Sequence, residues 1–554
     1  MEVMAKKYFI SQQEQQEQQE QQQKQPGGQG QGRGQGAENA APSSTSPASY
    51  FSEDVLKVVV NAVERYAGLA RSILEADDLA VRQGHPLQGK YIVLASGNEL
   101  ANRLRGVLSG FFLGILTDRV FVADITYQKD VTEGLLSALF EGPGYEWDLS
   151  KLSPQLRRAL GQNVSKGSTG KLRRGGGGAS GTGATLNFDM SKDYFQRWVC
   201  DDVVDASGAQ VVTLSTVVYP LPLLVRNPAY SGHPILQAAI AATATVGEGG
   251  PQSRGAGGGQ EDRLLQPGSS AGVVIGQRGV EALETILTRI ILRPARELRE
   301  RAADLGKRVR EEAERWRWRG RGERRGNANG REPPAVRIVG IHARTYFMKA
   351  VSSGTLERNL QHLEDCAVAG GGGSQAADDT FLFVATDELD TQKIARKVWG
   401  DRCYFAPFGL PGSKLEGIKA AFVDLLVMGS FDDFVMTPHS SFSELGATLS
   451  YTWFPDSQVA LRALPNRPIV PVFPDMNGFE RRKIFSLLDR RATEIVPPAG
   501  GVAGGTGGGE GMCMRAHAAG MSVTVAKGRE LLSMFEAIED APCMRERRAS
   551  VAVL

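Results

Sequence analysis

The chain has 554 residues, a formal net charge of +2 and 41% hydrophobic residues, which suits two or three globular domains rather than a fibrous protein. The near balance of charge gives no indication of a nucleic-acid partner. No stretch approaches the roughly 18 apolar residues that span a bilayer, and residues 1–10 lack the apolar core of a signal peptide. The cysteines show no spacing typical of a zinc site and would form at most two internal disulfides, whose pairing the sequence leaves open; they are Cys200, Cys366, Cys403, Cys513 and Cys543.

The chain begins with residues 1–50, which are rich in Gln and Glu and then in Gly, Ser and Pro. Such a segment cannot bury enough apolar surface to offset chain entropy, so we predict disorder. Apolar residues at helical spacing begin at Val55. A strand over Tyr91–Ala95, a helix and a second strand over Val120–Asp124 follow. This order predicts a β-α-β unit with a parallel strand pair.

Gly-rich stretches interrupt the rest of the chain and are predicted to be flexible surface loops. They are residues 175–183, 247–272, 320–331, 370–373 and 500–511. Between them, Glu281–Leu298 predicts two helices broken at Pro294, and Arg296–Arg325 predicts a charged helix that ends in a Trp- and Arg-rich run. Such a run can bind polyanions, but we favour a solvated helix that leads into a loop.

A second series of strands and helices begins at Val336 and continues for about 110 residues. The predicted strands are Arg337–His342, Phe381–Ala385, Cys403–Ala406 and Asp433–Thr437. Each precedes a predicted helix: from Ser353 to Cys366, through Ile394 and Val398, over Lys414–Gly429, and opening at residues 438–442. This alternation predicts a doubly wound, Rossmann-like α/β domain.

Polar side chains follow three of these strands. The first strand ends at His342 and Arg344, the second at Asp387, and the last at Ser440 and Ser441. In a parallel sheet these groups share the carboxyl edge, where open α/β sheets bind ligands. Arginine offers a planar fork for phosphate, a carboxylate can accept hydrogen bonds from a base or ribose, and a helix start suits an anion. Together they indicate a nucleotide diphosphate site; the alternative is a surface ion pair and two helix caps.

The first β-α-β unit carries a polar turn of its own. Asn102 and Arg103 lie where the helix begins and would reach a phosphate or sugar across an interdomain cleft. In the alternative interpretation, Asn102 caps the helix and Arg103 pairs with Asp118 or Asp124.

Other motif matches do not support chemistry. Gly176–Gly181 and Gly268–Gly272 fit Gly-rich and nucleophile-elbow patterns, but no strand precedes either one. No D-x-D motif occurs, which argues against a sugar-nucleotide site built around a metal ion. We therefore expect no cofactor.

Several short motifs follow one another along the chain in a characteristic order. They are Leu100–Arg103 with Leu116–Val122, Leu139–Trp147, Ile291–Pro294, Ile338–Arg344, Thr437–Ser443, and Cys513–Arg515 with Met521. This series, over about residues 90–525, resembles fucosyltransferases, most closely the plant xyloglucan-type α-1,2-fucosyltransferase family. The His342-Ala-Arg344 pattern and the strand ending Ala385-Thr-Asp387 are also similar to the core α-1,6 and O-fucosyl branches.

The resemblance implies a GT-B-like fold of two Rossmann-like domains that face a cleft. Residues 51–332 would form the acceptor-side domain, and residues 333–545 the GDP-sugar-binding domain. It further implies GDP-fucose as donor, a hydroxyl of a cell-wall polysaccharide or glycoprotein as acceptor, and inversion at the anomeric carbon. The alternatives are a transferase that uses another GDP-sugar and a non-catalytic glycan- or nucleotide-binding protein of the same fold.

The resemblance also implies roles for particular residues. Arg344 is expected to be the catalytic cation on the β-phosphate, assisted by Ser440 and Ser441, while Asp387 and His342 hold guanine or ribose. Asn102 and Arg103 would close on the donor from the opposite domain, and Phe442 would line the donor site. No pattern identifies a catalytic base; Glu141, Asp148 and Glu357 are the candidates.

The chain departs from the family at two points. Ala101 stands where the family has a glycine, and no anchor is visible although the family's members are typically type II Golgi membrane proteins. We expect the protein to be located in the Golgi. Its contact with the membrane would be an anchor in the true N-terminus alone. We expect no nucleic-acid partner.

Overall fold

The computed structural model describes two α/β units and the segments around them. The described residues are 53–95, 100–125, 134–161, 183–188, 200, 202, 204, 209–216, 221–238, 283, 286–288, 290–322, 336–369, 379–406, 415–431, 433–438, 440–449, 469–476, 494–496 and 512–515. The predicted disordered segment and nearly all of the Gly-rich stretches lie outside them. No helix among the described residues has the length and apolar character needed to cross a membrane.

The N-terminal unit is a parallel sheet with strand order β2-β1-β4-β3. Its strands are β1 (Tyr91–Ala95), β2 (Val120–Asp124), β3 (Gly183–Phe188) and β4 (Val211–Thr216). Around it lie α2 (Glu53–Arg82), α3 (Leu100–Thr117), α4 (Leu135–Leu139), η1 (Leu149–Lys151), α5 (Pro154–Gly161), α7 (Leu221–Arg226) and η3 (Pro228–Tyr230). The predicted β-α-β unit and its parallel pairing are confirmed, whereas β3 and β4 were not predicted.

A buried tyrosine fastens α2 to this sheet. The Tyr66 hydroxyl donates to the Arg119 carbonyl at 2.7 Å and accepts from the Phe121 amide at 2.9 Å. Its ring packs edge-on against Phe111 of α3, with centroids 5.1 Å apart. The contact ties two helices to β2 through one side chain.

The C-terminal unit is a seven-stranded sheet with order β10-β11-β9-β8-β5-β6-β7. Its strands are β5 (Arg337–Ala343), β6 (Thr380–Thr386), β7 (Cys403–Phe405), β8 (Asp433–Met436), β9 (Ile469–Val472), β10 (Glu494–Val496) and β11 (Met512–Arg515). Strands β5 to β9 run parallel, while β10 and β11 are antiparallel additions at one edge. The four predicted strands are confirmed, and with them the α/β class with a largely parallel sheet in each unit.

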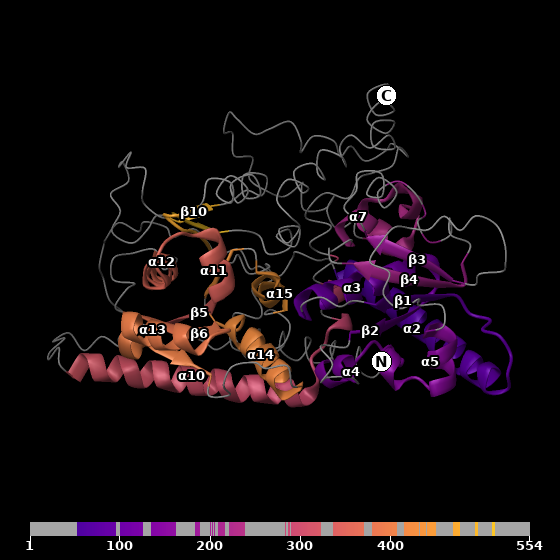
Figure 1. The fold of residues 1–554 in the computed structure, drawn as a ribbon, viewed down its shortest axis with the longest axis horizontal. Helices are drawn as coiled ribbons and strands as arrows, with labels where there is room; N and C mark the ends of the chain where they lie inside the picture. Colours follow the sequence, from indigo (N-terminus) through magenta and orange to yellow (C-terminus); the bar gives the residue numbers. More distant parts are fainter. Residues whose placement is uncertain are drawn as a thin grey trace, which may run out of the picture.

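Helices cover both faces of this sheet (Figure 1). They are α10 (Arg296–Gly322), α11 (Thr345–Val351), α12 (Leu356–Ala369), α13 (Leu389–Trp399), η6 (Gly400–Arg402), α14 (Leu415–Met428) and α15 (Ser441–Leu449). The predicted helix from Ser353 to Cys366 is α12, shifted by three residues at each end, and α11 before it was not predicted. Chain order runs β5, β6, β7 toward one edge and then returns to β8 on the other side of β5. The order therefore reverses between β5 and β8.

The long helix α10 differs from its prediction as a solvated helix. One face is buried and packs against α14, because apolar residues recur at helical spacing between the charges. These residues are Leu298, Ala302, Leu305, Val309 and Ala313. Arginines of its exposed face pair with neighbouring glutamates, among them Arg315 and Arg319 with Glu312.

The two units touch through elements that begin at the strands' carboxyl ends. Helix α3, which follows β1, contacts α15, which follows β8 (Figure 1). Elsewhere the Phe140 ring meets the Phe422 ring of α14 edge-on at 5.2 Å. Helix α15 therefore begins at the C-terminal sheet's carboxyl edge and also takes part in the contact with the N-terminal unit.

Candidate functional site

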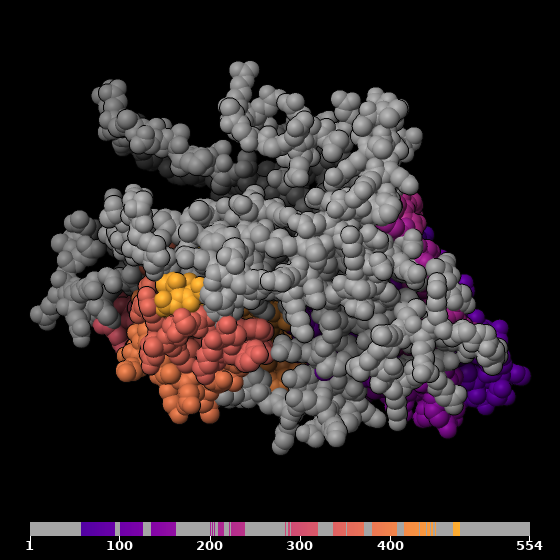
Figure 2. Space-filling view, turned by 45° about the horizontal axis from the view of Figure 1, so that its top comes forward, coloured from indigo at the N-terminus to yellow at the C-terminus, as the bar shows by residue number. Residues whose placement is uncertain are grey.

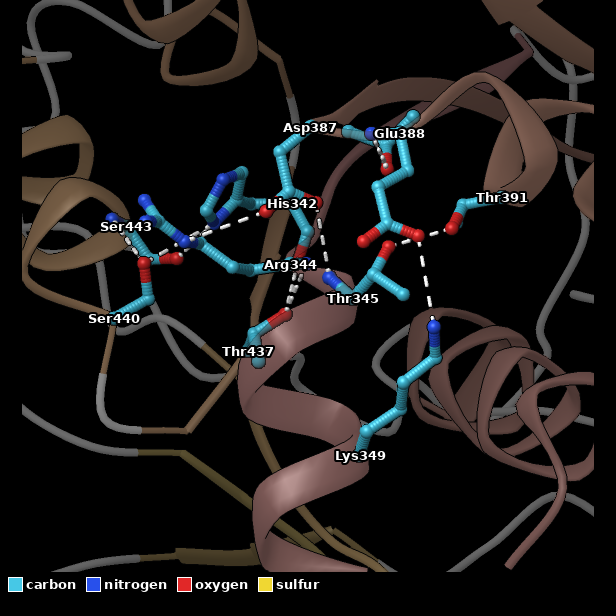
Figure 3. A network of polar contacts seen from close by, with 11 residues as sticks. His342, Arg344, Thr345, Lys349, Asp387, Glu388, Thr391, Thr437, Ser440 and Ser443 are labelled. Carbon is cyan, nitrogen blue, oxygen red and sulfur yellow. Dashed lines mark hydrogen bonds and ion pairs between the residues drawn. The ribbon is translucent and has the colours of Figure 1, made fainter.

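The predicted site residues of the C-terminal unit gather where its strand order reverses. His342 and Arg344 come from the end of β5, and Thr437 and Ser440 come from the end of the adjacent β8 (Figure 3). Asp387 lies at the end of β6, on the other side of β5. In open α/β sheets the carboxyl edge at such a reversal is where ligands bind.

Arg344 is held from both neighbouring strands. Its amide donates to the Thr437 hydroxyl at 2.9 Å, and that hydroxyl donates to the His342 carbonyl at 2.6 Å. Its Nε lies 3.5 Å from an Asp387 oxygen, and its guanidinium carbon lies 5.4 Å from the Phe347 ring centroid. The side chain keeps 25% of its surface exposed, so an anion can reach a cation whose backbone and plane are already fixed.

Asp387 organises the start of α11 as well as Arg344. While Oδ2 faces the arginine, Oδ1 accepts the Thr345 amide at 3.0 Å. The hydroxyls of Thr345 and Thr391 meet at 2.5 Å, which links α11 to α13. Asp387 thus supports a helix start, as its alternative interpretation proposed, but the helix is α11 and not the one that follows β6.

His342 is buried, with 4% of its surface exposed. Its Nδ1 lies 2.5 Å from the Ser443 hydroxyl and 3.4 Å from the Ser440 hydroxyl. Burial, and next the Arg344 charge, lowers the pKa of the imidazole to about 3, so the ring is neutral at physiological pH. In these contacts it ties β5 to the start of α15; its predicted role toward guanine or ribose stays a prediction.

Ser440 and Ser441 are both buried. The Ser440 hydroxyl accepts the Ser443 amide at 3.4 Å, which is the geometry of a helix N-cap. Phe442 is half-buried and places its ring 5.2 Å from that of His342. The predicted group His342, Ser440, Ser441 and Phe442 is therefore brought together, with Ser440 in the capping role of its alternative interpretation.

Asn102 and Arg103 lie in the first turn of α3, at the carboxyl edge of the N-terminal sheet. Asn102 is half-buried. Arg103 is 3% exposed and donates to the Ile125 carbonyl, just beyond β2, at 2.9 Å. Both residues occupy the predicted edge, with the Arg103 guanidinium engaged by backbone rather than open to the solvent.

The acidic residues considered as bases have structural contacts or lie in the open. Glu141 pairs with Arg293 and Arg299. Asp148 accepts the amides of Leu136, Ser137 and Ser150, and Glu357 is exposed at the start of α12. Within the described residues none of the three is shown in contact with the Arg344 group.

Sequence reasoning missed the hydroxyl residues that support the site. The hydroxyls of Thr345 and Thr391 join α11 to α13, and the Ser443 hydroxyl lies within hydrogen-bond distance of the His342 ring. Two signals pointed toward them: a threonine directly after Arg344, and the spacing Ser440-x-x-Ser443 at a helix start.

Among the described residues, one group has the composition of a metal site. His362 and Cys366 of α12 and Cys513 of β11 bring their ligand atoms within 4.8 Å of one another. Cys366 and Cys513 are joined as a disulfide, which occupies both sulfur atoms. The group therefore serves as a covalent link between α12 and β11.

The sequence matches no protein-family model and no curated protein. Solved structures that are similar to this chain include that of Arabidopsis thaliana FUT1, an arginine-to-lysine mutant in complex with GDP, at 14% identity and a TM-score of 0.44, over 74% of this chain and 78% of that one. Another is NodZ α-1,6-fucosyltransferase soaked with GDP-fucose, at 12% identity and a TM-score of 0.36, over 69% of this chain and 95% of that one. Both TM-scores are low, so neither similarity assigns a function to this chain.

Proposed function

We propose that the protein is a glycosyltransferase that moves fucose from GDP-fucose to a hydroxyl of a glycan. The observation that carries the proposal is the place of Arg344. It is a partly exposed arginine, fixed by Thr437 and Asp387, at the reversal point of a parallel sheet. Such a position and such a cation suit a nucleotide diphosphate. The order of fucosyltransferase-like motifs along the sequence supports fucose as the sugar.

The chemistry requires a cation at the leaving group. When the bond between fucose and the β-phosphate breaks, negative charge develops on GDP, and a preorganised donor stabilises it without reorganisation at the moment of reaction. Arg344 suits this role because its backbone amide donates to the Thr437 hydroxyl, which in turn donates to the His342 carbonyl. We propose that Arg344 provides this stabilisation without a metal ion.

The neighbouring residues act as supports. Asp387 holds the Arg344 side chain and the start of α11, and neutral His342 holds the start of α15. Helix α15 touches α3, on which Asn102 and Arg103 stand. We propose that these two residues complete the donor site from the N-terminal unit. We further propose that the acceptor hydroxyl attacks the anomeric carbon of fucose with inversion at that carbon. The proposed location of the protein is the Golgi.

A donor-hydrolysis assay tests the proposal. The full chain, incubated with GDP-fucose alone, should release GDP slowly, with water replacing the acceptor. GDP-mannose and GDP-glucose in the same assay distinguish a transferase for another GDP-sugar. If GDP-fucose binds in calorimetry but no GDP is released with any glycan, the protein is a binding module, and the proposed enzyme is wrong.

A further inference from the structure

An exposed aromatic residue stands next to the Arg344 group. Tyr346 is 67% exposed, which is rare for so large an apolar side chain among the described residues. Its ring lies edge-on to Phe347 at 5.4 Å, and Phe347 in turn lies 5.4 Å from the Arg344 guanidinium carbon. One aromatic ring therefore separates Tyr346 from the cation proposed to receive GDP.

A second exposed apolar residue lies at the end of the adjacent strand. Leu389 opens α13 and is 57% exposed. It follows Asp387 by two positions, as Tyr346 follows Arg344. Thus both residues of the Arg344–Asp387 pair lead directly into an exposed apolar side chain at the carboxyl edge of the sheet.

An ion pair joins α11, which carries Tyr346, to the residue before Leu389. Lys349 of α11 lies 3.6 Å from Glu388, the residue before Leu389, and the two side chains are 62% and 44% exposed (Figure 3). Tyr346 and Lys349 are three residues apart and so share a face of α11. We define these residues, Tyr346, Lys349, Glu388 and Leu389, as the α11 patch. Figure 2 shows salmon-coloured surface of the segment to which α11 belongs open on one face of the molecule, beside the orange surface that follows it in the chain.

The composition of the α11 patch suits a sugar ring. An open aromatic face offers apolar contact to the C–H groups of a pyranose, while an exposed ammonium and carboxylate can exchange their weak mutual pairing for hydrogen bonds to hydroxyls. A nucleotide base needs a pocket that buries most of its surface, whereas a glycan chain can pass across an open face. The patch also lies beside the cation proposed for the β-phosphate, the end of the nucleotide where the reacting bond is.

We propose that the α11 patch is an acceptor subsite on the C-terminal unit, in addition to the acceptor side expected for residues 51–332, where a pyranose ring of the glycan stacks on Tyr346 and hydrogen-bonds through its hydroxyls to Lys349 and Glu388. The proposal rests on the proposed function, since it takes Arg344 as the cation at the reacting end of the donor. Stacking there would hold the acceptor hydroxyl within reach of the anomeric carbon, which is the part of catalysis that comes from orientation.

The test separates acceptor binding from donor binding. The full chain, saturated with GDP, is titrated with a galactose-terminated xyloglucan oligosaccharide and with a galactose-terminated N-glycan, and binding is followed by saturation-transfer NMR. At least one glycan should bind the wild type, and Tyr346→Ala should raise its Kd about tenfold through loss of the aromatic contact. Tyr346→Phe, which keeps the ring, should stay within about twofold of the wild type.

Trp318→Ala is the matched control, because Trp318 is 68% exposed but lies on α10; it should leave the glycan Kd unchanged. Calorimetry with GDP on the acceptor-free chain provides the second readout. Binding of neither glycan, or an unchanged Kd in Tyr346→Ala, overturns the acceptor subsite. Loss of GDP affinity in Tyr346→Ala also overturns it, since the ring would then belong to the donor site. A wild type that binds no GDP contradicts the proposed function instead.

Discussion

Substitutions of Arg344 can separate the effect of its positive charge from the effect of the planar shape of its guanidinium group. Lysine keeps the positive charge but lacks the planar fork that matches a phosphate and the flat face that stacks on Phe347. We therefore expect Arg344→Lys to lower the rate of GDP release from GDP-fucose nearly as much as Arg344→Ala, by about 100- to 1000-fold. If Arg344→Lys keeps most of the turnover, Arg344 does not have the proposed role.

Asp424 is a half-buried residue with a buried carboxyl oxygen, Oδ1, and the proposed chemistry does not use it. It stands on α14, and its Oδ1 has no hydrogen-bond partner among the described residues. Burial raises the pKa of this carboxyl to about 8, an effect that the Arg301 charge partly offsets. The folded chain therefore holds a proton on Asp424 that the unfolded chain releases near pH 4.

The sign of the pH effect follows directly. Between about pH 4 and pH 8 the native state binds the extra proton, so Asp424 costs more stability as the pH rises. Asp424→Asn removes this dependence, and its gain over the wild type should grow from pH 5 to pH 8 by at most about 1.4 kcal/mol per pH unit. Urea unfolding at the two pH values measures the difference, with Asp390→Asn as an exposed control, whose pKa is instead lowered by Lys393. Equal gains at both values would contradict the assignment.

At the scale of elements, β5 depends on a glycine. A methyl group on Gly340 would lie 2.8 Å from the Met428 carbonyl oxygen and 3.1 Å from the Met428 Cα. The end of α14 can therefore pack closely against β5 only because Gly340 has no side chain. We expect Gly340→Ala to push α14 outward and to destabilise the fold by about 1–3 kcal/mol.

Gly306→Ala on α10 is the matched control for Gly340→Ala. Its new methyl group would find only side-chain atoms, at 3.5 Å and beyond, and alanine is the better helix former by about 0.5–1 kcal/mol. Thermal unfolding of the two variants should therefore shift in opposite directions. A stable Gly340→Ala protein would show that α14 does not depend on this close approach.

The sequence predicted those elements whose pattern is local. The six predicted strands, β1, β2 and β5 to β8, carry apolar runs between turn residues, and each was found within a few residues of its predicted place. The strands β3, β4 and β9 to β11 were missed. β3 and β11 directly adjoin the Gly-rich stretches 175–183 and 500–511, and strands in such surroundings carry little pattern of their own. The buried face of α10 was missed for another reason, since its dense charges outweighed the apolar spacing.

At the site, the strand-end residues were predictable and their contacts were not. Parallel strands bring His342, Arg344, Asp387 and Ser440 to one edge whatever the details. Which of them touch depends on the strand order, and no local pattern encodes that β8 lies beside β5. The link between Cys366 and Cys513 was open for the same reason.

At the scale of the whole molecule, one covalent bond holds the antiparallel edge of the C-terminal sheet. The disulfide joins Cys366 of α12 to Cys513 of β11 across 147 residues. Closing so long a loop removes much of the unfolded chain's entropy, so we expect Cys513→Ser to cost about 2–5 kcal/mol. Unfolding midpoints with and without a dithiol reductant measure the cost.

Cys403 supplies the control for the disulfide, because it is a buried free cysteine of the same sheet. Cys403→Ser should show a wild-type response to the reductant. If the reductant leaves the wild-type midpoint unchanged, the disulfide does not support the fold in solution.

The sequence separation of the two cysteines also determines how long the disulfide is delayed during biosynthesis. Helix α12 and strand β5 leave the ribosome long before Cys513 is made, and at about 5–20 residues per second the delay is about 7–30 s. During that interval the Cys366 thiol is without its native partner, while Cys403 emerges after it as a closer one. A nascent chain arrested before residue 513 is therefore the form most open to mispairing, and an isomerase would matter most for this protein in that interval.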